Sequence, residues 1–207
     1  MILLIPNEIL NFLKTLWPML LLFIIVICSI RVIDIIFNKK KIVIYQELMN
    51  LMFIIYLLLL FQLVTTTDFE SFSNNFIPFK EIMRYRLDSS LFYRNVIGNI
   101  ILFVPFGYLV SYYIKSPKYY IALILTVITS LSTEVIQMYI GRSFDIDDII
   151  LNIAGGLLGY LVFKIQYKLI GILPQILRKN WIADILVILL FVFVLFGIVL
   201  VFGGYNV

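Results

Sequence analysis

The run YYIALILTVITSLSTEVIQMYI, residues 119–140, decides the fold class of this chain. It is apolar over nearly the whole length that an α-helix needs to cross a bilayer, which is ~20 residues. A carboxylate, Glu134, stands close to its end, where a charge is costly unless it is paired or faces water. The run therefore predicts a membrane-spanning helix with a candidate functional group near one end.

Five more apolar blocks of similar length fill most of the remaining sequence. They are residues Leu16–Ile36, Ile42–Val64, Val96–Ile114, Ile149–Lys168 and Ile182–Phe202. The chain is 63% hydrophobic and 14% charged, whereas a soluble domain is about half apolar and about a quarter charged. These features predict an all-α fold, a polytopic transmembrane helical bundle of about six helices with a long outer loop between the second and third. Residues 1–207 are expected to form a single transmembrane domain.

The composition also excludes several kinds of chemistry. The chain has no histidine, which rules out a Ser-His-Asp triad and a zinc site with histidine ligands. Cys28 is the only cysteine, so an internal disulfide cannot form. No nucleic-acid partner is expected.

Basic residues cluster in three short segments, after the first, third and fifth apolar blocks. These residues are Arg31, Lys39, Lys40 and Lys41, then Lys115 and Lys118, then Lys164, Lys168, Arg178 and Lys179. Short basic loops stay in the cytoplasm. The pattern predicts a multi-pass protein with both termini outside, together with the segments Thr65–Arg94 and Gly141–Asp148. The first of these segments mixes aromatic and charged residues, which is typical of chain lying at the membrane interface.

Polar residues of the membrane region are concentrated in the third, fourth and fifth predicted helices and the turn before the fifth. The candidates are Asn95, Asn99, Glu134, Gln137, Arg142, Asp145, Asp148 and Asn152. Within each helix they are spaced by three or four positions and so share a face. Because the helices alternate in direction, all these groups are expected to meet in the outer half of the bilayer. Six of the ten glycines lie between residues 98 and 159, which predicts that the three helices pack closely, with Gly156 or Gly159 at a crossing.

Each group also has a purely structural explanation. Asp145 can be a helix N-cap, and the asparagines can simply link helices. Glu134 and Arg142 can form a buried ion pair. Arg31 and Asp34, three residues apart, are expected to form a local pair.

The motifs in this region resemble those of the VanZ-like family of bacterial membrane proteins. They are Asn75–Phe79, Gly98–Asn99, Phe103–Gly107, Glu134 with Gln137, Gly141–Asp148, Asn152 and Gly159. The resemblance covers a core of about residues 74–160 and implies a place in the bacterial cytoplasmic membrane. It also implies a link to low-level resistance to teicoplanin, a lipoglycopeptide that acts on cell-wall precursors outside the membrane.

Three function classes remain open. The leading expectation is action at the outer membrane face, in cell-envelope modification or glycopeptide resistance, with membrane lipids and a lipid-linked cell-wall precursor or lipoglycopeptide as partners. The second is a membrane enzyme acting on a lipid-linked headgroup, with Glu134 and Asp148 as catalytic groups and Arg142 binding phosphate. The third is a small transporter or flippase, which the scarcity of polar groups in the inner half disfavours.

No cofactor is expected, although the oxygen ligands would suit a divalent cation such as magnesium or calcium. The remaining candidates, Asn95, Asn99, Gln137, Asp145 and Asn152, are expected to bind the substrate together with Arg142.

Overall fold

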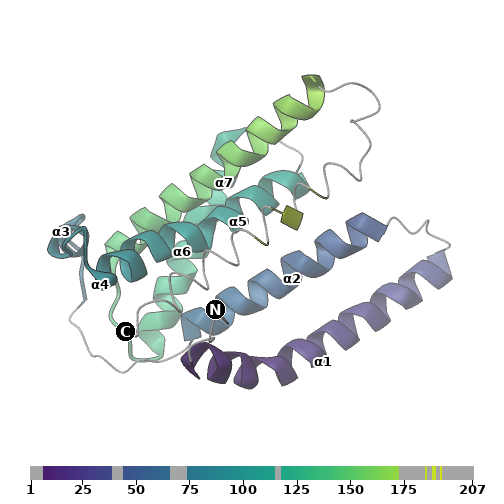
Figure 1. Ribbon diagram of the computed structural model, residues 1–207, viewed down its shortest axis with the longest axis horizontal. Coiled ribbons are helices and arrows are strands. Elements are labelled where there is room, and N and C mark those ends of the chain that lie inside the picture. Colours follow the sequence, from purple (N-terminus) through teal and green to yellow (C-terminus); the bar gives the residue numbers. More distant parts are fainter. Residues whose placement is uncertain are drawn as a thin grey trace, which may run out of the picture. The chain divides into compact units, whose positions relative to one another are not determined.

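The computed structural model describes residues 7–38, 44–65, 74–114 and 118–172, with the isolated positions 185, 188, 189 and 192 (Figure 1). Its elements are α1 (Asn7–Asn38), α2 (Ile44–Thr65), α3 (Lys80–Arg84), α4 (Ser90–Phe92), the π-helix η1 (Tyr93–Ile97), α5 (Gly98–Ile114), α6 (Tyr119–Tyr139) and α7 (Ile146–Ile172). No strand occurs in these ranges, where Asn75 and Asp145 form an isolated parallel bridge. The all-α class is confirmed.

Four helices in the described part of the chain are long and apolar enough to cross a membrane. They cover Leu21–Asn38, Ser90–Ile114, Tyr119–Tyr139 and Ile146–Leu169. The second predicted block corresponds to α2, whose apolar stretch Met49–Gln62 is shorter. The sixth block, Ile182–Phe202, lies outside the described residues apart from the isolated positions. These helices indicate a membrane protein, and they correspond to four of the six predicted apolar blocks.

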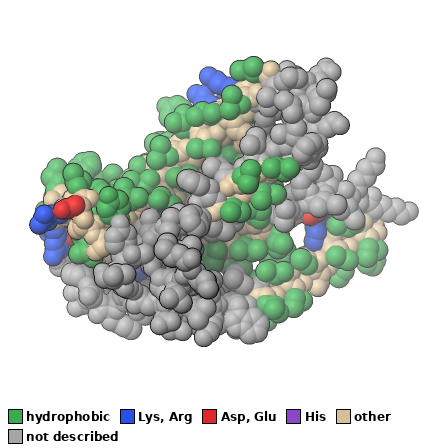
Figure 2. Space-filling model, viewed as in Figure 1, with side chains coloured by type: hydrophobic (Ala, Val, Ile, Leu, Met, Phe, Trp, Pro, Cys, Tyr) green, Lys and Arg blue, Asp and Glu red, His purple; other side chains and the backbone are tan. Residues whose placement is uncertain are grey.

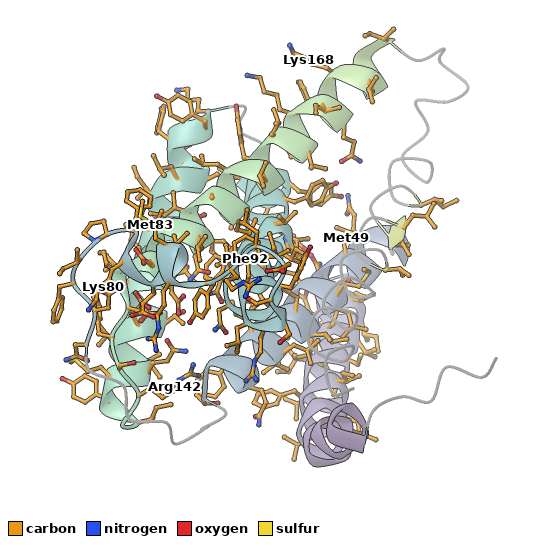
Figure 3. The ribbon with its side chains drawn as sticks, turned by 60° about the vertical axis from the view of Figure 1, so that its left-hand side comes forward. Met49, Lys80, Met83, Phe92, Arg142 and Lys168 are labelled. Carbon is orange, nitrogen blue, oxygen red and sulfur yellow. The ribbon has the colours of Figure 1, made fainter. Side chains whose placement is uncertain are left out.

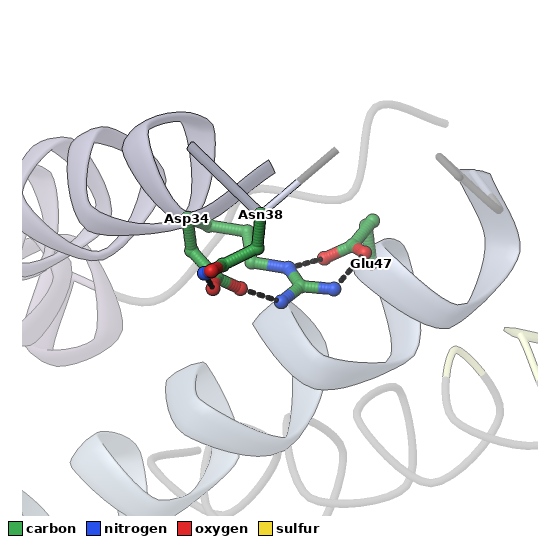
Figure 4. A network of polar contacts seen from close by, with 4 residues as sticks. Asp34, Asn38 and Glu47 are labelled. Atoms are coloured by element: carbon green, nitrogen blue, oxygen red, sulfur yellow. Dashed lines mark hydrogen bonds and ion pairs between the residues drawn. The ribbon is translucent and has the colours of Figure 1, made fainter. Parts of the chain in front are cut away.

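The chain divides into two compact units, Met1–Leu63 and Val64–Val207. In the first unit, Arg31 on α1 holds Glu47 on α2 in a two-pronged contact, with Nε donating to Oε2 at 2.7 Å and Nη2 to Oε1 at 2.6 Å (Figure 4). Its Nη1 donates to Asp34 at 2.5 Å, and Asn38 donates to the same carboxylate at 2.6 Å. The expected Arg31–Asp34 pair is confirmed. Glu47 extends it into a network that ties α1 to α2.

In the second unit, α5, α6 and α7 pack together, and the contact between α5 and α7 is the most extensive (Figure 1). Glycines permit it. A Cβ atom on Gly107 would lie 1.9 Å from the carbonyl oxygen of Gly156, and one on Gly159 would lie 2.0 Å from the carbonyl oxygen of Val104. Another face of α7 meets α6, because a Cβ on Gly156 would lie 2.3 Å from Thr126 Oγ1. The predicted close crossing at Gly156 and Gly159 is confirmed.

The buried face of α6 is largely polar. Its buried residues are Ala122, Thr126, Ser130, Glu134 and Gln137. Large apolar side chains such as Ile124, Ile128 and Leu131 are exposed instead. This inverts the pattern of a soluble protein, and it fits a helix whose outer face meets lipid while polar groups are paired inside the bundle. The polar stripe leads directly to the candidate site.

Candidate functional site

Glu134 is the centre of the polar cluster, and its side chain is 1% exposed. Its Oε2 accepts a hydrogen bond from the backbone N–H of Asp145 at 2.9 Å. The amide orientation of Gln137 that pairs donors with acceptors lets its nitrogen donate to Glu134 Oε1 at 3.0 Å and its oxygen accept from Arg142 Nη1 at 3.2 Å. Gln137 thus lies between the carboxylate and the guanidinium, so Arg142 reaches Glu134 through an amide.

The turn between α6 and α7 shapes this contact. Gly141 has a φ of 91°, a conformation that glycine adopts without steric cost. The next residue, Arg142, donates its backbone N–H to the carbonyl oxygen of Gln137 at 2.9 Å. The reversal of the chain here carries Asp145 back to Glu134 and starts α7 beside the end of α6.

Asp148 joins α7 to α5, since its Oδ1 accepts a hydrogen bond from Asn99 Nδ2 at 2.6 Å. Asp148 is partly exposed, unlike Glu134. Asn95 instead donates to the hydroxyl of Tyr85 at 2.9 Å. The π-helix η1 contains Asn95 and ends just before Gly98, so the α-helical spacing assumed for Asn95 and Asn99 does not apply there. The two asparagines therefore hold different partners.

Asn152 lies one turn beyond Asp148 and is 4% exposed. Its Nδ2 donates to Ser130 Oγ at 2.9 Å, which links α7 to α6 one turn below Glu134. Among the described residues, the buried atoms Asn152 Oδ1 and Thr126 Oγ1 have no hydrogen-bond partner. Polar contacts between α6 and α7 thus continue one turn past Glu134 and Asp148.

Asp145 has a clear structural role as the residue before α7. Its Oδ1 accepts from the backbone N–H of Asp147 at 2.9 Å and from Asn75 Nδ2 at 2.8 Å. Asn75 also pairs through its backbone, donating to the carbonyl of Phe144 at 2.8 Å and accepting from Ile146 at 3.0 Å. Burial raises the pKa of Asp145, an effect that these two hydrogen bonds oppose and the neighbouring charges of Asp147 and Glu81 reinforce.

Asp147 was not among the predicted site residues, yet it is 1% exposed and fully engaged. Its Oδ1 accepts from the backbone N–H of Phe79 at 2.5 Å, and its Oδ2 accepts from Glu81 at 2.7 Å and Ile82 at 3.1 Å. It therefore caps α3 from another helix. Phe79, the residue before α3, has a left-handed φ of 66°, which non-glycine residues seldom adopt.

Tyr85 was also missed. It accepts the hydrogen bond of Asn95, and burial raises the pKa of its hydroxyl, with the charges of Glu81 and Asp148 adding to the rise and the Asn95 bond opposing it. No helical or strand periodicity marks this residue, which lies in the connection between α3 and α4. The aromatic residues of this loop predict a position at the membrane interface, but they do not predict the hydrogen bond between Asn95 and Tyr85.

The cluster occupies one end of the α5–α7 bundle, where α6 ends and where α5 and α7 begin. Arg142 lies toward this end in Figure 3, and Lys168 lies at the other end of α7. In the part of the chain that the structure describes, no three acidic or cysteine side chains converge as metal ligands would. Carboxyl and amide oxygens accept hydrogen bonds. The arrangement is therefore suited to binding a group that donates them.

Comparisons with known proteins agree with the motifs. A family model described as VanZ/LLP1 matches residues 19–173 of the chain. The chain is also similar to Protein VanZ of Enterococcus faecium, with 30% identity over 127 residues, which cover 58% of this chain and 71% of that protein. No solved structure matches the chain. The matched region contains all the candidate site residues and extends beyond residues 74–160 on both sides.

Proposed function

The chain belongs to the VanZ/LLP1 family, and on that premise we propose that it acts at the outer face of the bacterial cytoplasmic membrane. Its polar cluster binds the polar part of a membrane-associated ligand, either a lipid-linked cell-wall precursor or a lipoglycopeptide. The outcome for the cell is a change in the envelope or low-level protection against teicoplanin, as the family resemblance implies.

The observation that carries this proposal is the meeting of Glu134, Gln137, Arg142, Asp148 and Asn99 at one end of an apolar bundle. A carboxylate inside a spanning helix is costly and is retained where it has a task. Simple linkage of helices would not need two carboxylates at one helix end, because neutral amides and hydroxyls can make such links.

Hydrogen bonding supports a ligand with donor groups. Asp148 is partly exposed and one of its oxygens accepts from Asn99, and the unpaired Asn152 Oδ1 lies one turn below it. A peptide N–H or an ammonium group would pair with such acceptors, and both are common in peptide-containing ligands. Arg142 adds a guanidinium that can hold a carboxylate or phosphate in two-pronged fashion.

We infer the side of the membrane from the three basic segments of the sequence, which hold ten of its sixteen basic residues. Lys118 precedes α6, and Lys164 and Lys168 lie in the later part of α7, at the end of the bundle opposite the cluster (Figure 3). Basic residues near short loops favour the cytoplasmic side. The cluster is therefore on the outer side, where cell-wall precursors are used.

A second candidate is an enzyme acting on a lipid-linked headgroup. It is favoured by the presence of two carboxyl groups, Glu134 and Asp148, at the same end of the bundle, since such a pair can divide acid and base roles. Binding alone requires a stoichiometric amount of protein, whereas an enzyme would convert a headgroup repeatedly.

The decisive experiment compares wild type, Glu134→Gln and Asp148→Asn in a teicoplanin-sensitive host, with Asp88→Asn as a control because Asp88 is exposed and outside the cluster. We expect wild type and the control to raise the inhibitory concentration of teicoplanin and both cluster variants to lose this protection at equal membrane levels. Full protection by both cluster variants would refute the proposal. A headgroup product that accumulates beyond the amount of protein would favour the enzyme.

A further inference from the structure

A short segment before α5 exposes several large apolar side chains although it precedes the spanning part of the chain. Phe76, Ile77, Phe79, Met83 and Leu87 are between 50% and 82% exposed. Water-exposed apolar patches of this kind are uncommon on proteins unless they meet a partner or a membrane. We call residues 76–87 the α3 segment.

The α3 segment also carries basic side chains that point into solvent. Arg84 and Arg86 have side chains that are 63% and 83% exposed, and Lys80 begins α3. Glu81, within the segment, pairs with Arg84 at 3.2 Å and is 21% exposed, and Asp88, directly after the segment, pairs with Arg86 at 3.4 Å. Figure 2 shows charged and hydrophobic side chains side by side at the end of the molecule where α3 lies. Apolar and basic groups together are typical of chain that lies at a bilayer surface.

Contacts with the start of α7 fix the depth of the segment. Asp147 binds three of its backbone N–H groups. The ring of Phe76 stacks on that of Phe144 with centroids 5.2 Å apart. The spanning stretch of α7 begins at Ile146, so the α3 segment is held at the level where the helix enters the bilayer.

We propose that the α3 segment is an interfacial arm that inserts Phe79, Met83 and Leu87 at the boundary of headgroups and acyl chains. Lys80, Arg84 and Arg86 contact the phosphates of anionic phospholipid. Charge complementarity selects this occupant, because the segment holds three basic residues, Lys80, Arg84 and Arg86, and one acidic residue, Glu81. This inference goes beyond the proposed function and does not depend on what the polar cluster binds.

Tryptophan fluorescence tests the depth of the α3 segment in the bilayer. The native Trp17 and Trp181 are replaced by Phe, and one Trp is placed at Met83 or Leu87 in full-length protein in nanodiscs. We expect lipids brominated near the headgroup to quench these positions most strongly. A matched control at Ile128, an exposed position midway along α6, should be quenched best by lipids brominated deep in the chain. Quenching by aqueous acrylamide without quenching by bromolipid would overturn the proposal, and so would quenching by neither.

The charge preference is tested separately with the Met83→Trp protein. Brominated anionic phospholipid is compared with brominated zwitterionic phospholipid at equal mole fraction, and we expect the anionic lipid to quench more strongly. Adding Lys80→Gln, Arg84→Gln and Arg86→Gln should abolish the difference while shallow quenching remains. Equal quenching by the two lipids in the protein with its native charges would overturn the role assigned to the basic residues.

Discussion

The carboxylate of Asp147 accepts a hydrogen bond from the backbone N–H of Glu81 at 2.7 Å, although 66 residues separate the two in the chain. The first N–H groups of a helix have no partner within the helix and need a cap. Phe79, the residue that precedes α3, provides no side-chain cap, and Asp147 replaces it from α7. A residue beside the candidate site thus holds the α3 segment in place.

Replacing Asp147 with Ala should destabilise the protein by about 2–3 kcal/mol, because three N–H groups lose a charged and buried acceptor. Thermal unfolding in detergent measures the change, and Asp88→Ala is the control because that side chain is 75% exposed. Asp147→Asn should retain part of the stability, since its amide oxygen can still accept. Equal unfolding temperatures for Asp147→Ala and Asp88→Ala would show that the cap contributes little.

The central helices could be predicted because each requirement for spanning a bilayer is local. An apolar run of sufficient length marks α5, α6 and α7, and the predicted end at Ile114 and start at Tyr119 agree with the structure. The polar stripe of Glu134 and Gln137 follows from helical spacing alone. The apolar block begins at Ile149, whereas α7 begins at Ile146, directly after Asp145, the residue expected as a possible N-cap.

Contacts that span long stretches of chain could not be predicted in the same way. The bonds from Phe79 to Asp147 and from Asn75 to Asp145 join residues 68 and 70 positions apart, and a backbone donor leaves no trace in the amino-acid pattern. The π-helical turn that separates the partners of Asn95 and Asn99 is equally hidden, because its residues are ordinary helix residues.

Adding a methyl group at Gly107 should disrupt the bundle, because the new Cβ would meet the backbone of Gly156 at 1.9 Å. The helices must then move apart, and overpacking of this kind costs about 1–3 kcal/mol or more. We expect Gly107→Ala to lower the yield of folded protein in size-exclusion chromatography and its unfolding temperature. Leu161→Ala, at a position 48% exposed on α7, is the control, and equal tolerance of both changes would contradict a tight crossing.

Orientation in the membrane can be tested by labelling single cysteines on a background without Cys28. The clustering of basic residues predicts that Ser143→Cys is labelled from outside by an impermeant reagent and that Lys40→Cys is labelled only after the membrane is opened. The reverse result would place the polar cluster on the cytoplasmic side. It would remove the proposed function at the outer face and leave the packing of α5, α6 and α7 unaffected.

The carboxyl group of Asp145 should make stability depend on pH. Its pKa is raised by burial above the usual 3.8, so the folded protein binds this proton more tightly than the unfolded chain. The contribution of Asp145 to stability is therefore fully present below the unfolded pKa and is lost as pH rises through the folded pKa. The charges of Asp147 and Glu81 lie near it, and Glu134 accepts a hydrogen bond from its backbone N–H.

Asp145→Asn isolates this contribution because asparagine is a comparable N-cap and its side-chain oxygen can keep the same acceptor role. Unfolding temperatures measured in detergent from about pH 4 to about pH 8 should fall less steeply for Asp145→Asn than for wild type. The unfolding temperature of the variant relative to that of wild type should therefore be highest at the alkaline end of this range. Asp88→Asn serves as the control, because its carboxylate is 75% exposed and pairs with Arg86, and its profile should parallel that of wild type. A profile for Asp145→Asn that also parallels wild type would show that burial of Asp145 carries no net proton linkage.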